Sequence, residues 1–187
     1  MPESVSPKPQ RRILYLLLAL FFLPVATSFF LYYGMEWRPA GGTNHGQLLQ
    51  PMRQLPASAQ QLQGKWALVY VGDGACGEAC RHALYIARQT HLLLNKDLWR
   101  VNRALLDTAN CCDRAFLDAE HEGILILDLA EPATRAELLA QLPPGDHSHH
   151  LFVIDPLQNI VLRFDTRENP RGLLDDLKKL LKLSQVG

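Results

Sequence analysis

The start of the chain changes abruptly from a polar, basic segment to an unbroken apolar run. The run, "ILYLLLALFFLPVATSFFLYY" from Ile13 to Tyr33, contains 21 residues and no charge. At a rise of roughly 1.5 Å per residue it is long enough to cross a hydrocarbon core of about 30 Å. Pro24 lies within the run, and membrane helices tolerate such a proline. The pattern predicts a transmembrane helix over residues 13–33.

The charges before this run predict its orientation. Residues 1–12 contain three basic residues, Lys8, Arg11 and Arg12, and one acidic residue, Glu3. The positive-inside rule therefore places residues 1–12 in the cytoplasm and the rest of the chain beyond the membrane. A cleaved signal peptide is the alternative, but its apolar region would span only roughly 7–15 residues. A buried core helix is a further alternative, but the N-terminal position of the run and its all-round apolarity argue against it, so we expect an uncleaved anchor.

The next segment, residues 34–63, is rich in Gly, Pro, Gln and Ser and reads as a tether and lead-in. His45 lies in it and is interpreted as a solvated linker residue. From residue 64 to residue 187 the texture changes to that of one domain of about 120 residues, which is an ordinary domain size.

Hydrophobic periodicity in this domain alternates between strand and helix patterns. The order of elements is β-α-β-α-β-α-β-β-α. It indicates an α/β fold with a mostly parallel sheet, helices on both faces and a C-terminal antiparallel hairpin, which is the thioredoxin-like order. The elements are strands at 65–71, 97–106, 123–129 and two within 150–165, and helices at 76–94, 113–120, 132–142 and 172–183.

The charge of the chain limits its partners. The formal net charge is +0 at pH 7, and no basic stripe follows the anchor. A nucleic acid or another polyanion is therefore not expected as a partner.

Candidate chemistry begins directly after the first strand of the domain. Cys76 and Cys80 lie at i and i+4 at the start of a helix, so both sulfurs project from one face. A helix N-terminus favours the thiolate form, which redox attack and metal ligation both require. A structural or redox disulfide outside the cytoplasm is an equally simple use of such a pair.

The stretches "KWALVYVGDGACGEACRHAL" and "DHSHHLFVIDP" together resemble the Sco (SenC) family, copper-binding assembly proteins of cytochrome c oxidase. In that family a strand leads into Cys-x-x-x-Cys and a helix, and a histidine in an Asp-His-Ser/Thr segment is the third copper ligand. The resemblance implies that Cys76, Cys80 and His147 bind copper as Cu(I) or Cu(II). It implies an oxidase subunit or another copper-assembly protein as partner. It also implies an inner-membrane anchor with the domain on the periplasmic side.

The chain departs from the family motif at several positions. Gly77 and Arg81 stand where prolines usually follow the cysteines, and Asp73 and Gly74 replace an aromatic and a hydroxyl residue before Cys76. The donor set stands on its own chemistry, since thiolates select Cu(I) and an added imidazole also suits Cu(II). Zn(II) would accept the same ligands.

Other histidines and cysteines have no firm assignment. Alternation along a strand sends His149 and His150 to opposite faces, so at most one of them approaches the site. Cys111 and Cys112 follow the second strand, at the sheet edge where the first cysteine pair also lies. Four roles are open for them: a resolving redox pair, further metal ligands, small buried thiols, or cysteines that form a disulfide with the first pair.

Three functional hypotheses remain open. The first is a membrane-anchored copper-binding and thiol-redox protein that assists cytochrome c oxidase assembly. The second is a metal-free, membrane-anchored thiol–disulfide oxidoreductase that uses Cys76 and Cys80. The third is a non-catalytic interaction subunit of the oxidase.

Overall fold

The computed structural model describes residues 8–34, 44–73, 75–109 and 113–184. It divides the chain into two compact units, residues 1–42 and 43–187. Cys111 and Cys112 lie outside the described residues, as does Gly74.

The first unit contains one helix, α1 (Lys8–Gly34), which includes Pro24. Its segment Arg11–Gly34 has a mean hydropathy of 2.3. Among the described residues it is the one helix long and apolar enough to cross a membrane. The helical run predicted from the sequence is therefore confirmed, and Thr27 Oγ1 donates a hydrogen bond to the Leu23 carbonyl one turn before it.

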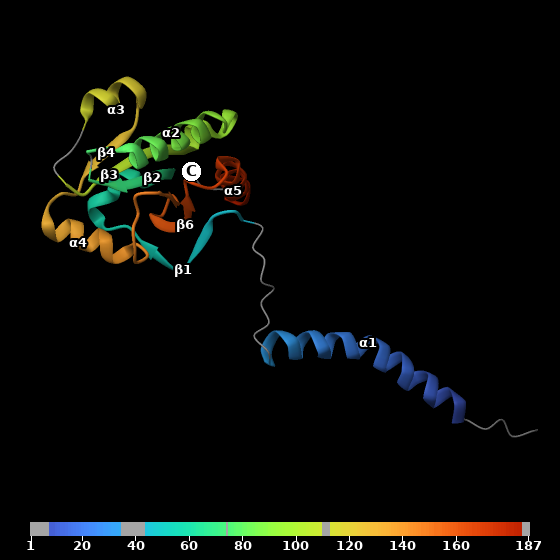
Figure 1. Ribbon diagram of the computed structural model, residues 1–187. Coiled ribbons are helices and arrows are strands. Elements are labelled where there is room, and N and C mark those ends of the chain that lie inside the picture. The colour runs from blue at the N-terminus through green and yellow to red at the C-terminus, as the bar shows by residue number, and fades with distance from the viewer. Residues whose placement is uncertain (1–7, 35–43, 74, 110–112, 185–187) are drawn as a thin grey trace, which may run out of the picture. The chain divides into compact units, whose positions relative to one another are not determined.

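The second unit is built on one six-stranded sheet, in the order β1-β6-β5-β2-β3-β4 (Figure 1). Strands β2, β3 and β4 pair in parallel, whereas β5 joins β2, β6 joins β5 and β1 joins β6 in antiparallel pairs. The strands are β1 (Gln47–Gln54), β2 (Trp66–Gly72), β3 (Val101–Asp107), β4 (Leu125–Asp128), β5 (His150–Ile154) and β6 (Asn159–Asp165). The thioredoxin-like α/β fold is confirmed, with more antiparallel pairing than predicted, since β1 adds a pair.

Helices cover both faces of this sheet, as predicted. The α-helices are α2 (Glu78–Leu92), α3 (Arg114–Glu120), α4 (Pro132–Gln141) and α5 (Pro170–Leu183), and the 3-10 helices are η1 (Ala57–Leu62) and η2 (Asn95–Arg100). Pro132 and Pro170 stand in first turns, where a missing N–H costs nothing. The strand predicted to begin at residue 97 is η2 up to Arg100 and becomes β3 only from Val101.

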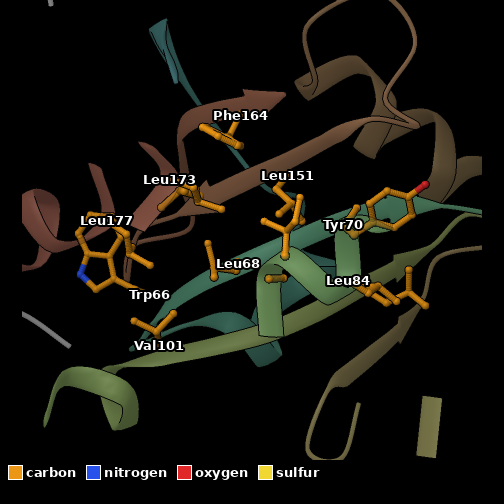
Figure 2. Close-up of a cluster of buried hydrophobic side chains, with 14 of the residues drawn as sticks. Trp66, Leu68, Tyr70, Leu84, Val101, Leu151, Phe164, Leu173 and Leu177 are labelled. Carbon is orange, nitrogen blue, oxygen red and sulfur yellow. The ribbon is translucent and has the colours of Figure 1, made fainter. Parts of the chain in front are cut away.

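The core consists of two layers, one on each side of the sheet. One cluster packs β2 and β5 side chains such as Leu68 and Leu151 against α2 and α5 (Figure 2). The other packs alternate residues of the same strands, including Val69 and Phe152, against α4 and η1. Because successive strand residues face opposite sides, central strands buried on both faces are apolar throughout.

The described part of the lead-in, residues 44–63, belongs to this unit. β1 pairs with β6, so residues 47–54 form an edge strand. His45, interpreted from the sequence as solvated, is bound to α5: its backbone N–H donates to Asp176 at 2.8 Å, and the N–H of Gly46 donates to the same carboxylate at 2.7 Å. Asp176 is buried, and two backbone donors satisfy it.

Candidate functional site

The cysteine pair lies at the connection between β2 and α2. β2 ends at Gly72, Gly77 caps α2, and Cys76 adopts a left-handed backbone with φ of 46°. Cys76 and Cys80 form a disulfide, with their Cα atoms 4.9 Å apart. The structure therefore brings the two predicted site cysteines together. The predicted shared helix face is wrong, because Cys76 precedes the cap residue Gly77 and only Cys80 lies in α2.

This disulfide closes a very short loop. Its sequence separation is 4, and a loop of that size contributes only about 2 kcal/mol to stability in the chain-entropy model. Both residues are nonetheless in the core, since their exposed fractions are 2% and 5%. They belong to the cluster that packs against α2 and α5, here called the cluster beneath α2. Reduced cysteines suit such surroundings, because a thiol packs as a small hydrophobic group. The pair is thus placed to open and close without dismantling the fold.

Arg81 joins the cysteine turn to α3. Its Nε donates to the Cys76 carbonyl at 3.2 Å, and its Nη2 donates to Asp113 at 2.9 Å. Its guanidinium also lies 4.0 Å from the centre of the Phe116 ring. Sequence analysis noted Arg81 only as a replacement for a proline. Its pairing with Asp113 could have been suspected, because a basic residue directly follows Cys80 and an acidic residue directly follows the second cysteine pair.

His147 lies in the loop that leads into β5. Its ring meets the Phe152 ring edge-on, with the two centres 5.6 Å apart. Burial lowers its pKa, and the positive charges of His150 and Arg163 lower it further. Its Nδ1 is buried and has no hydrogen-bond partner among the described residues. The imidazole is therefore neutral near pH 7, which is the form that a metal ion binds.

The loops that carry the cysteines and His147 meet at one end of the sheet. β2 and β5 are neighbours, with Tyr70 opposite Leu151. The Tyr70 hydroxyl donates to the Ser148 carbonyl at 3.2 Å. Burial raises the pKa of Tyr70 to about 12, with Asp73 and Asp146 adding to the shift, so the hydroxyl keeps its proton. A pocket of about 270 Å³ lies between the two loops, lined by residues that include Asp73 and His147.

The donor types that copper prefers are present at this end of the sheet, but they do not lie together in this structure. The sulfurs of Cys76 and Cys80 are bonded to each other and belong to the cluster beneath α2. His147 packs on Phe152, which belongs to the cluster on the opposite face. Within the described part of the chain, no three His, Cys, Asp or Glu side chains are grouped to hold a metal ion. A three-ligand site would need reduction of the disulfide and movement of His147.

Three further histidines have local contacts of their own. His150 lies at the start of β5 beside a second pocket, of about 210 Å³, which His45 and Arg163 also line. His91 places Nε2 at 2.7 Å from the Val101 carbonyl. His121 is buried edge-on against Phe116.

Comparison with known proteins supports the fold. Residues 66–184 match the family model described as "Transmembrane-like, thioredoxin-like, C-terminal domain". No match is found among curated proteins. Yeast Sco1 is similar in structure, with a TM-score of 0.57 and 17% identity over 73% of this chain and 96% of that one. Bradyrhizobium japonicum ScoI, solved with copper bound, has a TM-score of 0.51 and 19% identity over 72% and 98%. Arabidopsis thaliana ScoI, also with copper, has a TM-score of 0.54 and 15% identity over 67% and 89%. The similarity to Sco proteins predicted from the sequence is confirmed as a likeness of fold.

Proposed function

Since the chain belongs to the transmembrane-like, thioredoxin-like C-terminal domain family, we propose that it is a membrane-anchored copper-binding and thiol-redox protein that assists assembly of cytochrome c oxidase. One observation carries the proposal. The redox-active type of pair, Cys76 and Cys80, follows β2, and His147 precedes β5, the strand that pairs with β2. Three copper donors thus come from two loops at one end of the sheet.

The chemistry starts from the reduced pair. The N-terminus of α2 favours the thiolate of Cys76, and two soft thiolates select Cu(I) as cargo. The neutral imidazole of His147 would add a nitrogen donor and so extend the site to Cu(II). Alternatively the dithiol passes two electrons and two protons to a disulfide of the client. The client is then left with two thiols, and Cys76 and Cys80 return to the disulfide.

The anchor supports the location that we propose. The basic residues Lys8, Arg11 and Arg12 stand at the start of α1, before its apolar run, so the N-terminus is cytoplasmic and the thioredoxin-like domain lies on the periplasmic side of the inner membrane. In that compartment disulfides form and persist. The proposed partner is an oxidase subunit or another copper-assembly protein on the same side of the membrane.

A metal-free thiol–disulfide oxidoreductase is the second candidate. The observation that favours it is the closed Cys76–Cys80 disulfide, together with His147 packed on Phe152. Exchange of a disulfide requires the two sulfurs and does not require an imidazole.

Copper titration separates the two candidates. Fragment 43–187, which contains both core clusters, is reduced and titrated with Cu(I) and with Cu(II) in the presence of competing chelators. We expect about one copper per chain, lost in Cys76→Ser and Cys80→Ser. His147→Ala should weaken Cu(II) binding strongly and Cu(I) binding partly, with His149→Ala as the matched control.

Either of two results would exclude copper binding at this site. One is absence of binding by the reduced fragment. The other is binding that survives both serine variants. An unchanged Cu(II) affinity in His147→Ala would remove this residue from the ligand set and favour the oxidoreductase.

A further inference from the structure

The Cys76–Cys80 disulfide is closed to an incoming thiol in this structure. Thiol–disulfide exchange begins when a thiolate reaches one sulfur, so its rate depends on access. Cys76 and Cys80 are 2% and 5% exposed, and Phe116 of α3 packs against the cluster that contains them. Exchange therefore requires a neighbouring group to move.

The contacts of Arg81 identify the group that holds this arrangement together. Its guanidinium contacts the Cys76 carbonyl, the Asp113 carboxylate and the face of the Phe116 ring. Asp113 caps α3 by accepting from the N–H of Phe116 at 3.1 Å, and His121 flanks the other part of that ring. The Arg81 side chain thus joins the turn at Cys76, here called the cysteine turn, to the first turn of α3.

The ties are of the kind that can open. Arg81 and Asp113 side chains are 46% and 41% exposed, and exposed ion pairs and cation–π contacts are individually weak. Arg81 therefore holds α3 closed most of the time without locking it.

We propose that Arg81 is a positioning residue that controls access to the Cys76–Cys80 pair by holding α3 against the cysteine turn. The inference rests on the proposed thiol-redox function. Arg81 stands where a proline is usual in the resembled family, and a proline side chain has no donor with which to make these contacts.

The nature of the contacts predicts a kinetic rather than an equilibrium effect. Arg81 binds the carbonyl oxygen of Cys76, not a sulfur, and its other partners, Asp113 and Phe116, have no redox chemistry of their own. The same contacts can form in both redox states. Their loss should then speed reduction and reoxidation by the same factor and leave the midpoint potential unchanged.

The test uses the oxidised full-length protein in detergent with dithiothreitol as the reductant. A thiolate of the reagent attacks one sulfur, the S–S bond breaks and a cysteine thiolate leaves. The second thiol of the reagent then displaces the other cysteine, so the reagent is oxidised to its cyclic disulfide. Free thiols are first blocked with N-ethylmaleimide. Newly formed thiols are then labelled with its heavy isotopic form, and the peptide that contains Cys76 and Cys80 is quantified by mass spectrometry.

We expect Arg81→Ala to accelerate reduction by dithiothreitol, and reoxidation of the reduced pair by the cyclic disulfide of that reagent, by roughly three- to tenfold, given weak contacts at an exposed site. Asp113→Asn should accelerate both by less, because the other two contacts remain. Arg81→Lys should be intermediate, since one ammonium keeps the charge but lacks the fork that reaches two acceptors. Arg88→Ala removes the same charge from an exposed position of α2 and is the matched control.

Unchanged rates in Arg81→Ala, or equal acceleration in Arg88→Ala, would overturn the proposal while leaving the redox function intact. A shifted midpoint potential would also overturn it. Such a shift would show that the Arg81 contacts stabilise one redox state over the other and are merely structural. A disulfide that stays oxidised in every variant would overturn the proposed redox function and the control of access with it.

Discussion

Reduction of the Cys76–Cys80 disulfide should cost the domain little stability. The bond joins residues with a sequence separation of 4, for which the chain-entropy model predicts a contribution of about 2 kcal/mol at 25 °C, against about 3 kcal/mol for a 15-residue loop. The reduced thiols stay in the cluster beneath α2, where they still pack as small apolar groups. A domain with a typical stability of roughly 5–15 kcal/mol would remain folded.

Urea denaturation of fragment 43–187, followed by circular dichroism, measures this cost. The oxidised and reduced forms should differ by about 2 kcal/mol in unfolding free energy, with the same dependence on urea, because they expose the same surface. The Cys76→Ser/Cys80→Ser variant, with and without reductant, reports any contribution from Cys111 and Cys112.

A large loss would refute the reasoning. If reduction removed more than about 4 kcal/mol, or unfolded the fragment at 25 °C, the pair would be a structural staple. A pair that must open for each copper ion or client cannot also hold the fold together, so the proposed function would fail with it.

Three further predictions follow from the anchor, the lead-in and the buried histidines. A reporter that is active only outside the cytoplasm, fused after Gly187, should be active; activity of a cytoplasmic reporter alone would contradict the orientation. Asp176→Ala should lower the unfolding free energy by about 2–4 kcal/mol, because two backbone N–H groups lose their acceptor, whereas exposed Asp175→Ala should not, as urea denaturation can show. Burial lowers the pKa of His121, so the unfolded state binds more protons as the pH falls through about 6.5, and stability should decrease between pH 7 and pH 5. His121→Phe should flatten that dependence, and stability that rises on acidification would contradict it.

Several features could be predicted because they are encoded in neighbouring residues. A membrane span depends on one continuous apolar run, so the apolar part of α1 follows from residues 13–33 alone, although the helix itself begins earlier, at Lys8. Apolar strands alternate with amphipathic helices, and this order indicates the thioredoxin-like fold. The short spacing after β2 predicted that Cys76 and Cys80 lie close together at the start of a helix, and they are bonded there, although Cys76 precedes α2 and only Cys80 lies in it.

Edge pairing and long-range contacts were decided by the tertiary structure. β1 has mostly exposed side chains and no hydrophobic pattern; it is a strand because its backbone pairs with β6. His45 meets Asp176 across 131 positions of sequence, and no local pattern relates them.

The same limit applies to the site. The resemblance to the Sco family indicated His147 as a donor, but its packing on Phe152 depends on which face of β5 that ring occupies. Arg81 and Asp113 are 32 positions apart, and they meet because parallel strands β2 and β3 bring the loops after them to one edge. Local spacing sets the two cysteines close together at the start of α2, which carries Cys80 alone. Only the assembled sheet sets what lies over them, because those contacts join segments that the chain itself keeps far apart.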